Sequence, residues 1–273
     1  MKITPFWLLC GSLLSVSVFA NPTRLEQAVE GKHRTEAYVA RDQYRHPVKT
    51  LQLFDIQPSH TVVEVWPSGG WYTEILAPYL RSKGKLIAAH YDVEDKQAGY
   101  RSGSRTRFEK KMKASPKVYS KVDVVSLMFD ESTGTLIKPA AEPNSVDRVV
   151  TFRSAHGMYA QGTIDAAFAH FFDILKPGGK LGFVQHQADA GQDWMSKNIG
   201  YIGREYVVDM AAKSGFVLES EGYFNNNPQD TKRYDAGVWQ LPPSLRGSKT
   251  DAEKAPFITI GESDRMTLVF VKP

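Results

Sequence analysis

Two acidic residues, Glu64 and Asp92, flank a glycine pair at Gly69 and Gly70. The stretch from Thr61 to Asp92 starts as an alternating β-branched run and passes through a turn, a helical apolar pattern and a second apolar run, which predicts strand, helix and strand. Glycines at the first turn of such a unit let the backbone approach a ligand, and a carboxylate roughly 20 residues later can hold ribose hydroxyls. Asp92 lies 22 residues after Gly70. The spacing therefore indicates an adenosine site.

The run from Glu64 to Gly70, EVWPSGG, resembles the first motif of class I S-adenosylmethionine-dependent methyltransferases, an acidic residue followed by x-G-x-G-x-G. On that motif, Trp66 and Ser68 take the first two glycine positions and Gly70 the third, with Gly69 as an extra neighbour. Pro67 also removes one amide donor from the loop. The resemblance implies that these loop residues hold the methionine part of S-adenosylmethionine and that Asp92 holds its ribose. The alternative is an ordinary turn of an α/β protein.

Further candidates follow two later predicted strands. The run from Val118 to Phe129 predicts a third strand that ends at Asp130, and the run from Val146 to Phe152 predicts a buried fourth strand that opens onto Arg153 and His156. Open parallel sheets bind ligands outside the carboxyl ends of their strands. We therefore expect Arg153 and His156 to lie at a ligand site.

The resemblance gives these residues roles. An acid after the third strand can hold the adenine amine in such methyltransferases, which implies that role for Asp130, and residues past the fourth strand lie beside the methyl donor and acceptor. His156 is accordingly a candidate general base, and Arg153 a candidate ligand for an anionic substrate. The alternatives are a turn residue for Asp130, a helix cap for Arg153 and a hydrogen-bonded loop histidine for His156. His186, after the next strand, is a further candidate or a turn residue.

The later motifs predict the fold. A helix over Ile164 to Leu175 is followed by Lys176-Pro177-Gly178-Gly179 and an apolar run, which resembles the turn before the fifth strand of the same methyltransferases. Pro177 would end the helix, and the glycines would allow a reversal with positive φ. With a helix over 199–214, a sixth strand at 216–218 and a final strand over 264–273, we predict a Rossmann-like class I methyltransferase fold. It has a seven-stranded, mostly parallel sheet with an antiparallel last strand and helices on both faces.

The N-terminus has the pattern of a secretory signal peptide. Lys2 is followed by an apolar segment from Phe6 to Val18 and by small residues that end at Ala20, where we expect cleavage. An uncleaved anchor helix is the alternative, but the apolar segment is short for a membrane span. We therefore expect a periplasmic or secreted protein without stable membrane insertion, with one domain over 21–273 that begins with a helical segment over 21–57.

Composition limits the possible chemistry. The 273 residues contain 34 Lys and Arg against 30 Asp and Glu, and one cysteine, Cys10, which the cleavage would remove. Disulfides and thiol catalysis are then excluded, and the acidic residues and histidines do not follow metal-ligand spacings. The basic stretch over 96–117 predicts the solvated face of a crossover helix rather than a nucleic-acid site.

Two functions follow from these patterns. The first is methyl transfer from S-adenosylmethionine to a small-molecule acceptor, without a metal or a nucleic-acid partner. The second is a non-catalytic, exported ligand-binding protein that retains the methyltransferase fold. The run from Trp66 to Thr73 and the loop from Gly237 to Pro243, a candidate lid or packing segment, also resemble a group of exported predicted methyltransferases. The acceptor and the oligomeric state stay open.

Overall fold

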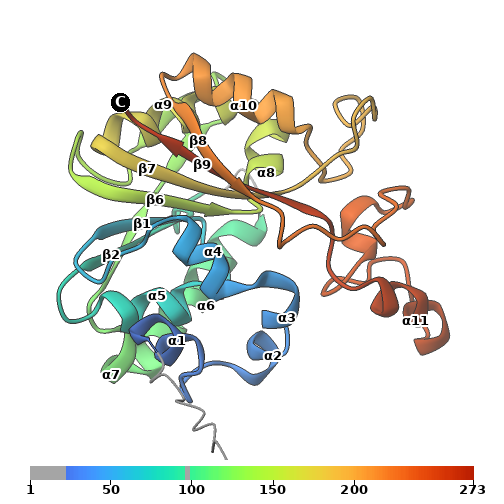
Figure 1. The fold of residues 1–273 in the computed structure, drawn as a ribbon, viewed down its shortest axis with the longest axis horizontal. Helices are drawn as coiled ribbons and strands as arrows, with labels where there is room; N and C mark the ends of the chain where they lie inside the picture. The colour runs from blue at the N-terminus through green and yellow to red at the C-terminus, as the bar shows by residue number, and fades with distance from the viewer. Residues whose placement is uncertain (1–22, 96–98) are drawn as a thin grey trace, which may run out of the picture.

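A computed structural model describes residues 23–95 and 99–273, which fold around a central sheet (Figure 1). Its strands are β1 (Thr61–Val65), β2 (Lys85–His90), β3 (Val122–Ser126), β6 (Val146–Phe152), β7 (Leu175–His186), β8 (Val217–Gly222) and β9 (Arg265–Val271). They form one seven-stranded sheet in the order β3-β2-β1-β6-β7-β9-β8. The first five of these strands are parallel, and β9 runs antiparallel to both β7 and β8. The predicted sheet, including its antiparallel last strand, is confirmed.

Helices cover both faces of the sheet (Figure 1). One face carries α1 (Arg24–Val29), α4 (Pro47–Leu53), α5 (Thr73–Leu80), α6 (Gly99–Ala114) and α7 (Pro116–Tyr119). The other carries α8 (Ala155–Ala160), α9 (Ile164–Ile174) and α10 (Arg204–Lys213). The short helices α2 (Glu36–Val39) and α3 (Asp42–Arg45) lie beside the first group, and α11 (Asp251–Ile260) projects to one side of the sheet.

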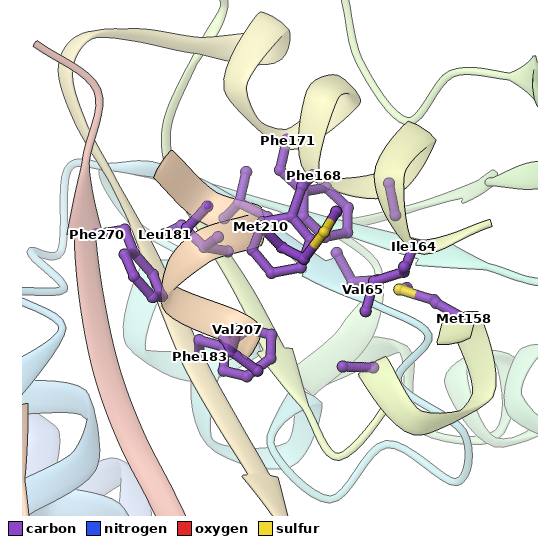
Figure 2. Packing of buried hydrophobic residues seen from close by; sticks show 14 of the residues in the cluster. Val65, Met158, Ile164, Phe168, Phe171, Leu181, Phe183, Val207, Met210 and Phe270 are labelled. Atoms are coloured by element: carbon purple, nitrogen blue, oxygen red, sulfur yellow. The ribbon is translucent and has the colours of Figure 1, made fainter. Parts of the chain in front are cut away.

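The alternation of side chains along the strands divides the core into two layers. Val62 belongs to the layer under α5, whereas Val63 and Val65 belong to the layer under α9 and α10. In the second layer Phe168 of α9 and Phe183 of β7 pack together with other aromatic and aliphatic side chains (Figure 2). The sheet is thus anchored on both sides, and the loops at its carboxyl edge are left to form a site.

Three predicted boundaries are wrong. The third strand covers only Val122–Ser126, because Val118 lies in the helical turn α7. The residues after β3 form a separate antiparallel hairpin of β4 (Met128–Asp130) and β5 (Thr135–Lys138). The string KPGG lies inside β7, where Gly178 has a φ of +75° and a register shift accommodates the turn. The helix predicted over 199–214 is shorter, since α10 begins at Arg204.

The N-terminal segment, which was predicted to be helical, contains the four short helices α1 to α4 within its described residues. Pro47 is the first residue of α4. The predicted signal peptide, residues 1–20, lies outside the described residues. Within residues 23–95 and 99–273, none of the helices has the length and apolar character needed to cross a membrane.

Candidate functional site

The loop between β1 and α5 has the backbone of a glycine-rich turn although two of its residues carry side chains. The angle φ is +44° at Trp66, +53° at Ser68 and +80° at Gly70. Residues with a side chain seldom adopt positive φ, and where such a conformation persists the surrounding structure holds it. Positions 66, 68 and 70 are those at which the sequence motif expects glycine, so the loop keeps the conformation while two glycines are replaced.

Neighbouring side chains hold this loop. Nε2 of His90 is 3.1 Å from the carbonyl oxygen of Ser68, and Nδ1 of His90 accepts from the N–H of Tyr91. Burial lowers the pKa of His90 to about 4, so the ring is neutral and its Nε2–H donates to Ser68. The carbonyl oxygen of Gly69 accepts from Lys111 Nζ at 2.9 Å. These contacts explain how the strained backbone is maintained.

Glu64 lies buried at the end of β1, where it joins the strand to α5. Its side chain is 2% exposed, and its carboxylate accepts a hydrogen bond of 2.6 Å from the hydroxyl of Thr73. Burial raises the pKa of Glu64 to about 7, although the bond from Thr73 and the charge of Lys111 oppose the rise. The hydrogen bond between Glu64 and Thr73 therefore links the two ends of the loop, at β1 and at α5.

The carboxylate of Asp92 follows β2, as the spacing predicted, but it is already paired. It accepts from Lys138 Nζ of β5 at 2.6 Å and from the N–H of Glu94 at 2.9 Å. Burial alone would raise the pKa of Asp92, but these donors outweigh it and hold the pKa at about 2. Asp130 lies at the end of β4 and accepts from the N–H and the hydroxyl of Ser132, which makes it a turn residue in this structure.

A cavity of about 630 Å³ opens at the carboxyl ends of β1, β6 and β7. This is the edge at which open parallel sheets bind ligands. The residues that line it at the strand ends and in the loops directly after them include Trp66, Ser68, Tyr91, Arg153, His156 and His186. The cavity thus brings together five of the candidate residues, namely Trp66, Ser68, Arg153, His156 and His186, whereas Glu64, Gly69, Gly70, Asp92 and Asp130 do not line it.

Arg153 enters the cavity from the end of β6. Its φ is +61°, and its N–H donates to the carbonyl oxygen of Val184 at 2.7 Å, which continues the pairing of β6 with β7. Its guanidinium makes no hydrogen bond or ion pair with any residue in the described part of the chain. Burial and the nearby positive charge of Arg45 lower the pKa of Arg153, while Glu262 raises it. The side chain is a cation without a direct partner.

His156 and His186 line the cavity as neutral rings. Nδ1 of His156 accepts from the amide of Gln185 at 3.3 Å, so in the neutral ring Nε2 carries the proton. Burial lowers the pKa of His156 to about 4 and that of His186 well below its usual value. Nδ1 of His186 is hydrogen-bonded to Oγ of Ser263. Nδ1 of His156 is engaged and Nε2 carries the proton, so the ring presents a hydrogen-bond donor, and its role as a general base stays a prediction.

Glu262 lies in the cavity wall at the centre of a group of arginines. Its carboxylate accepts from Nε of Arg41 at 2.5 Å, from Nε of Arg45 at 2.9 Å and from Nη1 of Arg265 at 2.9 Å. Burial by itself raises the pKa of Glu262, but Arg45, Arg265, Arg153 and Arg41 together hold it at about 2. We call Glu262 with Arg41, Arg45 and Arg265 the arginine cluster.

The loop predicted as a lid or a packing segment forms the outer wall of the cavity. It begins with a 3₁₀ helix over Gly237–Gln240, and Val238, Trp239 and Leu241 line the cavity. Gly237 has a φ of +59°, and a Cβ there would lie 2.5 Å from the carbonyl oxygen of Ile199, so only glycine lets the loop approach so closely. The guanidinium of Arg246, another lining residue, packs 4.9 Å from the ring centre of Trp239.

No protein-family model matches the sequence, and no curated protein matches it. Solved structures do. A SAM-dependent methyltransferase from Aquifex aeolicus aligns over 86% of this chain and 93% of its own, with a TM-score of 0.55 and 13% identity. This chain has the fold of class I S-adenosylmethionine-dependent methyltransferases.

Two further solved structures that align with this chain have other activities in their names. The [4+2]-cyclase SpnF aligns over 84% of this chain and 80% of its own, with a TM-score of 0.55 and 14% identity. Geranyl diphosphate methyltransferase, solved with GPP and sinefungin, aligns over 83% and 77%, with a TM-score of 0.50 and 13% identity. At such identities the likeness establishes the fold, and function has to be argued from the site.

The loop backbone and the adjoining cavity can accommodate the methionine part of S-adenosylmethionine. The indole of Trp66 packs against Tyr91 and Phe129, which directly precede Asp92 and Asp130, the residues to which the resemblance assigns adenosine. Its ring centre lies 4.9 Å from that of Tyr91 and 6.2 Å from that of Phe129, and its Nε1–H donates to the carbonyl oxygen of Leu127. A ribose at Asp92 would have to compete with Lys138 for the carboxylate.

The strand pattern of the sequence correctly predicted the edge of the sheet at which the cavity lies, but it did not predict the arginine cluster in the cavity wall. Trp66, Ser68, Arg153 and His156 were found because each follows a strand with a clear apolar pattern. The arginine cluster was missed because Arg41 and Glu262 are 221 residues apart and neither belongs to a motif. Only the tertiary structure brings them together.

Proposed function

We propose that this chain is an S-adenosylmethionine-dependent methyltransferase that acts on a small molecule bound in the cavity. The observation that carries the proposal is the positive φ at Trp66, Ser68 and Gly70, because it retains the glycine-loop backbone at the cost of strain at two residues. A loop without a ligand would gain stability by relaxing. The fold, the position of Asp92 and the cavity at the carboxyl edge support the same function.

The chain's own residues would act by binding and orientation. S-adenosylmethionine supplies a methyl group activated by a sulfonium charge when it is bound. The loop from Trp66 to Gly70 would hold its methionine part, and Asp92 its ribose. Arg153 and the Nε2–H of His156 face the remaining cavity, where they can hold the acceptor in line with the methyl group. Such positioning supplies most of what a methyl transfer requires.

Calorimetric titration with S-adenosylmethionine and S-adenosylhomocysteine tests the proposal. We expect binding at micromolar concentrations, loss of binding in Asp92→Ala and tighter binding in Trp66→Gly, which opens the adenosine space. Asp209→Ala, an exposed change on α10, is the control and should bind like the wild type. Absence of binding in both the wild type and a folded Trp66→Gly variant would refute the proposal.

A second candidate is a ligand-binding protein that has lost methyl transfer. The packing of Trp66 against Tyr91 and the ion pair between Lys138 and Asp92 favour it, because both lie at or beside Asp92, to which the resemblance assigns the ribose. A protein of this kind would bind a ligand in the cavity and ignore S-adenosylmethionine. The same titration separates the two candidates.

We also propose that the protein works outside the cytoplasm, in the periplasm or as a secreted protein. The basic, apolar and small-residue order of residues 1–20 supports this location. Mass spectrometry of the mature protein tests it. A chain that begins at Asn21 is expected, and a chain that retains Lys2 and the apolar segment would refute the proposal.

A further inference from the structure

We propose that the cavity binds a small organic oxyanion, a carboxylate or a phosphate ester, whose charged group pairs with the guanidinium of Arg153. The assignment of this anion as the methyl acceptor rests on the proposed function. The binding site itself follows from the charges and contacts of the cavity wall.

Arg153 brings a cation to the edge of the cavity. Its backbone is held in a conformation with φ of +61° by the pairing of β6 with β7, which directs it to the cavity edge. Its guanidinium has no hydrogen-bonded or ionic partner within the described residues. A partly buried cation is costly unless it is paired, and the planar guanidinium matches the geometry of a carboxylate or phosphate. A bound oxyanion would supply the missing partner.

The carboxylate in the cavity wall is already engaged by other arginines. Glu262 is the only acidic residue among the described residues that line the cavity. It is 3% exposed, and three arginines already donate to it. With Arg153, four guanidinium groups surround one carboxylate, which leaves three positive charges uncompensated. Nη2 of Arg41 and Nη2 of Arg45 are also buried without a partner among the described residues.

The remaining wall of the cavity adds further donors and aromatic surface. The Nε2–H of His156 is a donor, and Arg246 lies over Trp239 and brings a further cation to the lining. Tyr91 and Trp239 offer aromatic surface for the organic part of a ligand. The described lining therefore brings two guanidinium groups, Arg153 and Arg246, against the single carboxylate of Glu262. An acceptor atom that is already an oxyanion also needs no general base, which agrees with the lowered pKa of His156 and His186, since burial makes both rings weak bases.

Titration of the full chain with benzoate and phenyl phosphate tests the inference, and neutral benzamide is the matched control ligand. Trp66 and Trp239 line the cavity, so their fluorescence reports binding without any methyl transfer. Because a hydrogen bond to a charged group is worth about 1.5 to 3 kcal/mol, an anionic probe should bind about 10- to 100-fold more tightly than benzamide. Equal binding of benzoate, phenyl phosphate and benzamide would overturn the inference.

Variants locate the site. Arg153→Gln should reduce binding of the tighter anion about 10- to 100-fold, and Arg107→Gln, an exposed change on α6, should leave it unchanged. Arg153→Lys keeps the charge in case the glutamine variant does not fold. It should bind more weakly than the wild type because a single ammonium group cannot form the paired hydrogen bonds. Wild-type affinity in a folded Arg153→Gln or Arg153→Lys variant would overturn the inference.

A competition experiment separates this inference from the proposed function. Anion binding at Arg153 that persists while S-adenosylhomocysteine fails to bind even Trp66→Gly would refute methyl transfer and support the anion site. Simultaneous binding of benzoate and S-adenosylhomocysteine supports an acceptor site beside the cofactor. Mutually exclusive binding would show that Arg153 serves the carboxylate of the cofactor, and would overturn the assignment to the acceptor.

Discussion

Replacing Glu262 by glutamine removes the carboxylate that Arg41, Arg45 and Arg265 share. The amide is nearly isosteric, so the main effect is the loss of one negative charge from a group whose members are mostly buried. Removing one partner of a buried ion pair typically costs about 3–5 kcal/mol, because the opposite charge stays buried without compensation. We therefore expect Glu262→Gln to lower the free energy of unfolding by about that amount at pH 7.

The pKa of Glu262 gives a second measure of the same effect. The pKa is about 2 in the folded protein and has an ordinary value of 4.5. At roughly 1.36 kcal/mol per pH unit, the difference corresponds to about 3 kcal/mol of stability. Because the folded-state pKa is the lower one, this stability is present above pH 4.5 and is lost as the pH falls from 4.5 towards 2. The difference in free energy of unfolding between the wild type and Glu262→Gln should therefore be about 1 kcal/mol smaller at pH 3.5 than at pH 7.

Urea unfolding followed by circular dichroism measures both effects. Glu205→Gln is the matched control, since the Glu205 side chain is 78% exposed and lies only at the edge of ion-pair distance, 3.9 Å from Arg204. Surface changes of that kind usually stay within about 0.5 kcal/mol. A Glu262→Gln variant as stable as the control at pH 7, or a deficit that does not depend on pH, would refute the account of the arginine cluster.

Three further predictions concern the loop and its surroundings. The stability of Glu64→Gln relative to the wild type, measured as the free energy of unfolding, should rise by up to about 3 kcal/mol between pH 4.5 and pH 8. The reason is that the wild-type carboxyl has a pKa of about 7 in the folded protein, so folding disfavours its charged form. Urea unfolding at pH 5 and pH 8 measures this change, and an equal difference in stability at both pH values would contradict the prediction. Lys138→Met should move the pKa of Asp92 from about 2 towards 3.8 in an NMR titration, and an unchanged value would show that Lys138 is not its partner. Trp66→Gly should lower the free energy of unfolding by about 2–4 kcal/mol, since removal of a buried indole costs about 3–5 kcal/mol and relief of the positive φ returns about 1 kcal/mol. Chemical unfolding measures this change, and a variant as stable as the wild type would mean that the packing of the indole does not stabilise the fold.

The sequence predicted the fold well where each strand carries its own signal. Val146–Phe152 carries three valines and a phenylalanine, and it forms the strand β6 at the predicted bounds. The third strand was predicted too long because Val118 is apolar and β-branched, yet packs from the helical turn α7. The hairpin of β4 and β5 was missed because a short apolar run gives no sign of a reversal between two strands.

The site was predictable only in part, and for a physical reason. A residue that follows a parallel strand must lie at the carboxyl edge of the sheet, so Arg153 and His156 were found from local pattern alone. The direction of a side chain depends on the fold around it. The sequence therefore showed that Trp66 replaces a glycine but not that its indole packs on Tyr91, and it showed Asp92 but not that Lys138 takes its carboxylate.

The position of β9 in the sheet has a consequence for biosynthesis. β9 follows β8 in the sequence, yet it lies between β7 and β8 in the sheet, and Glu262 precedes it by three residues. During translation, Arg41 and Arg45 leave the ribosome more than 200 residues before Glu262, the carboxylate that they share. The nascent chain can collapse around β1, β2 and β6, but it cannot join β8 to β7 or place a carboxylate among these arginines until Glu262 and β9 have been synthesised. The cavity wall should therefore form only once β9 is available, in a step that a chain truncated before Glu262 cannot complete.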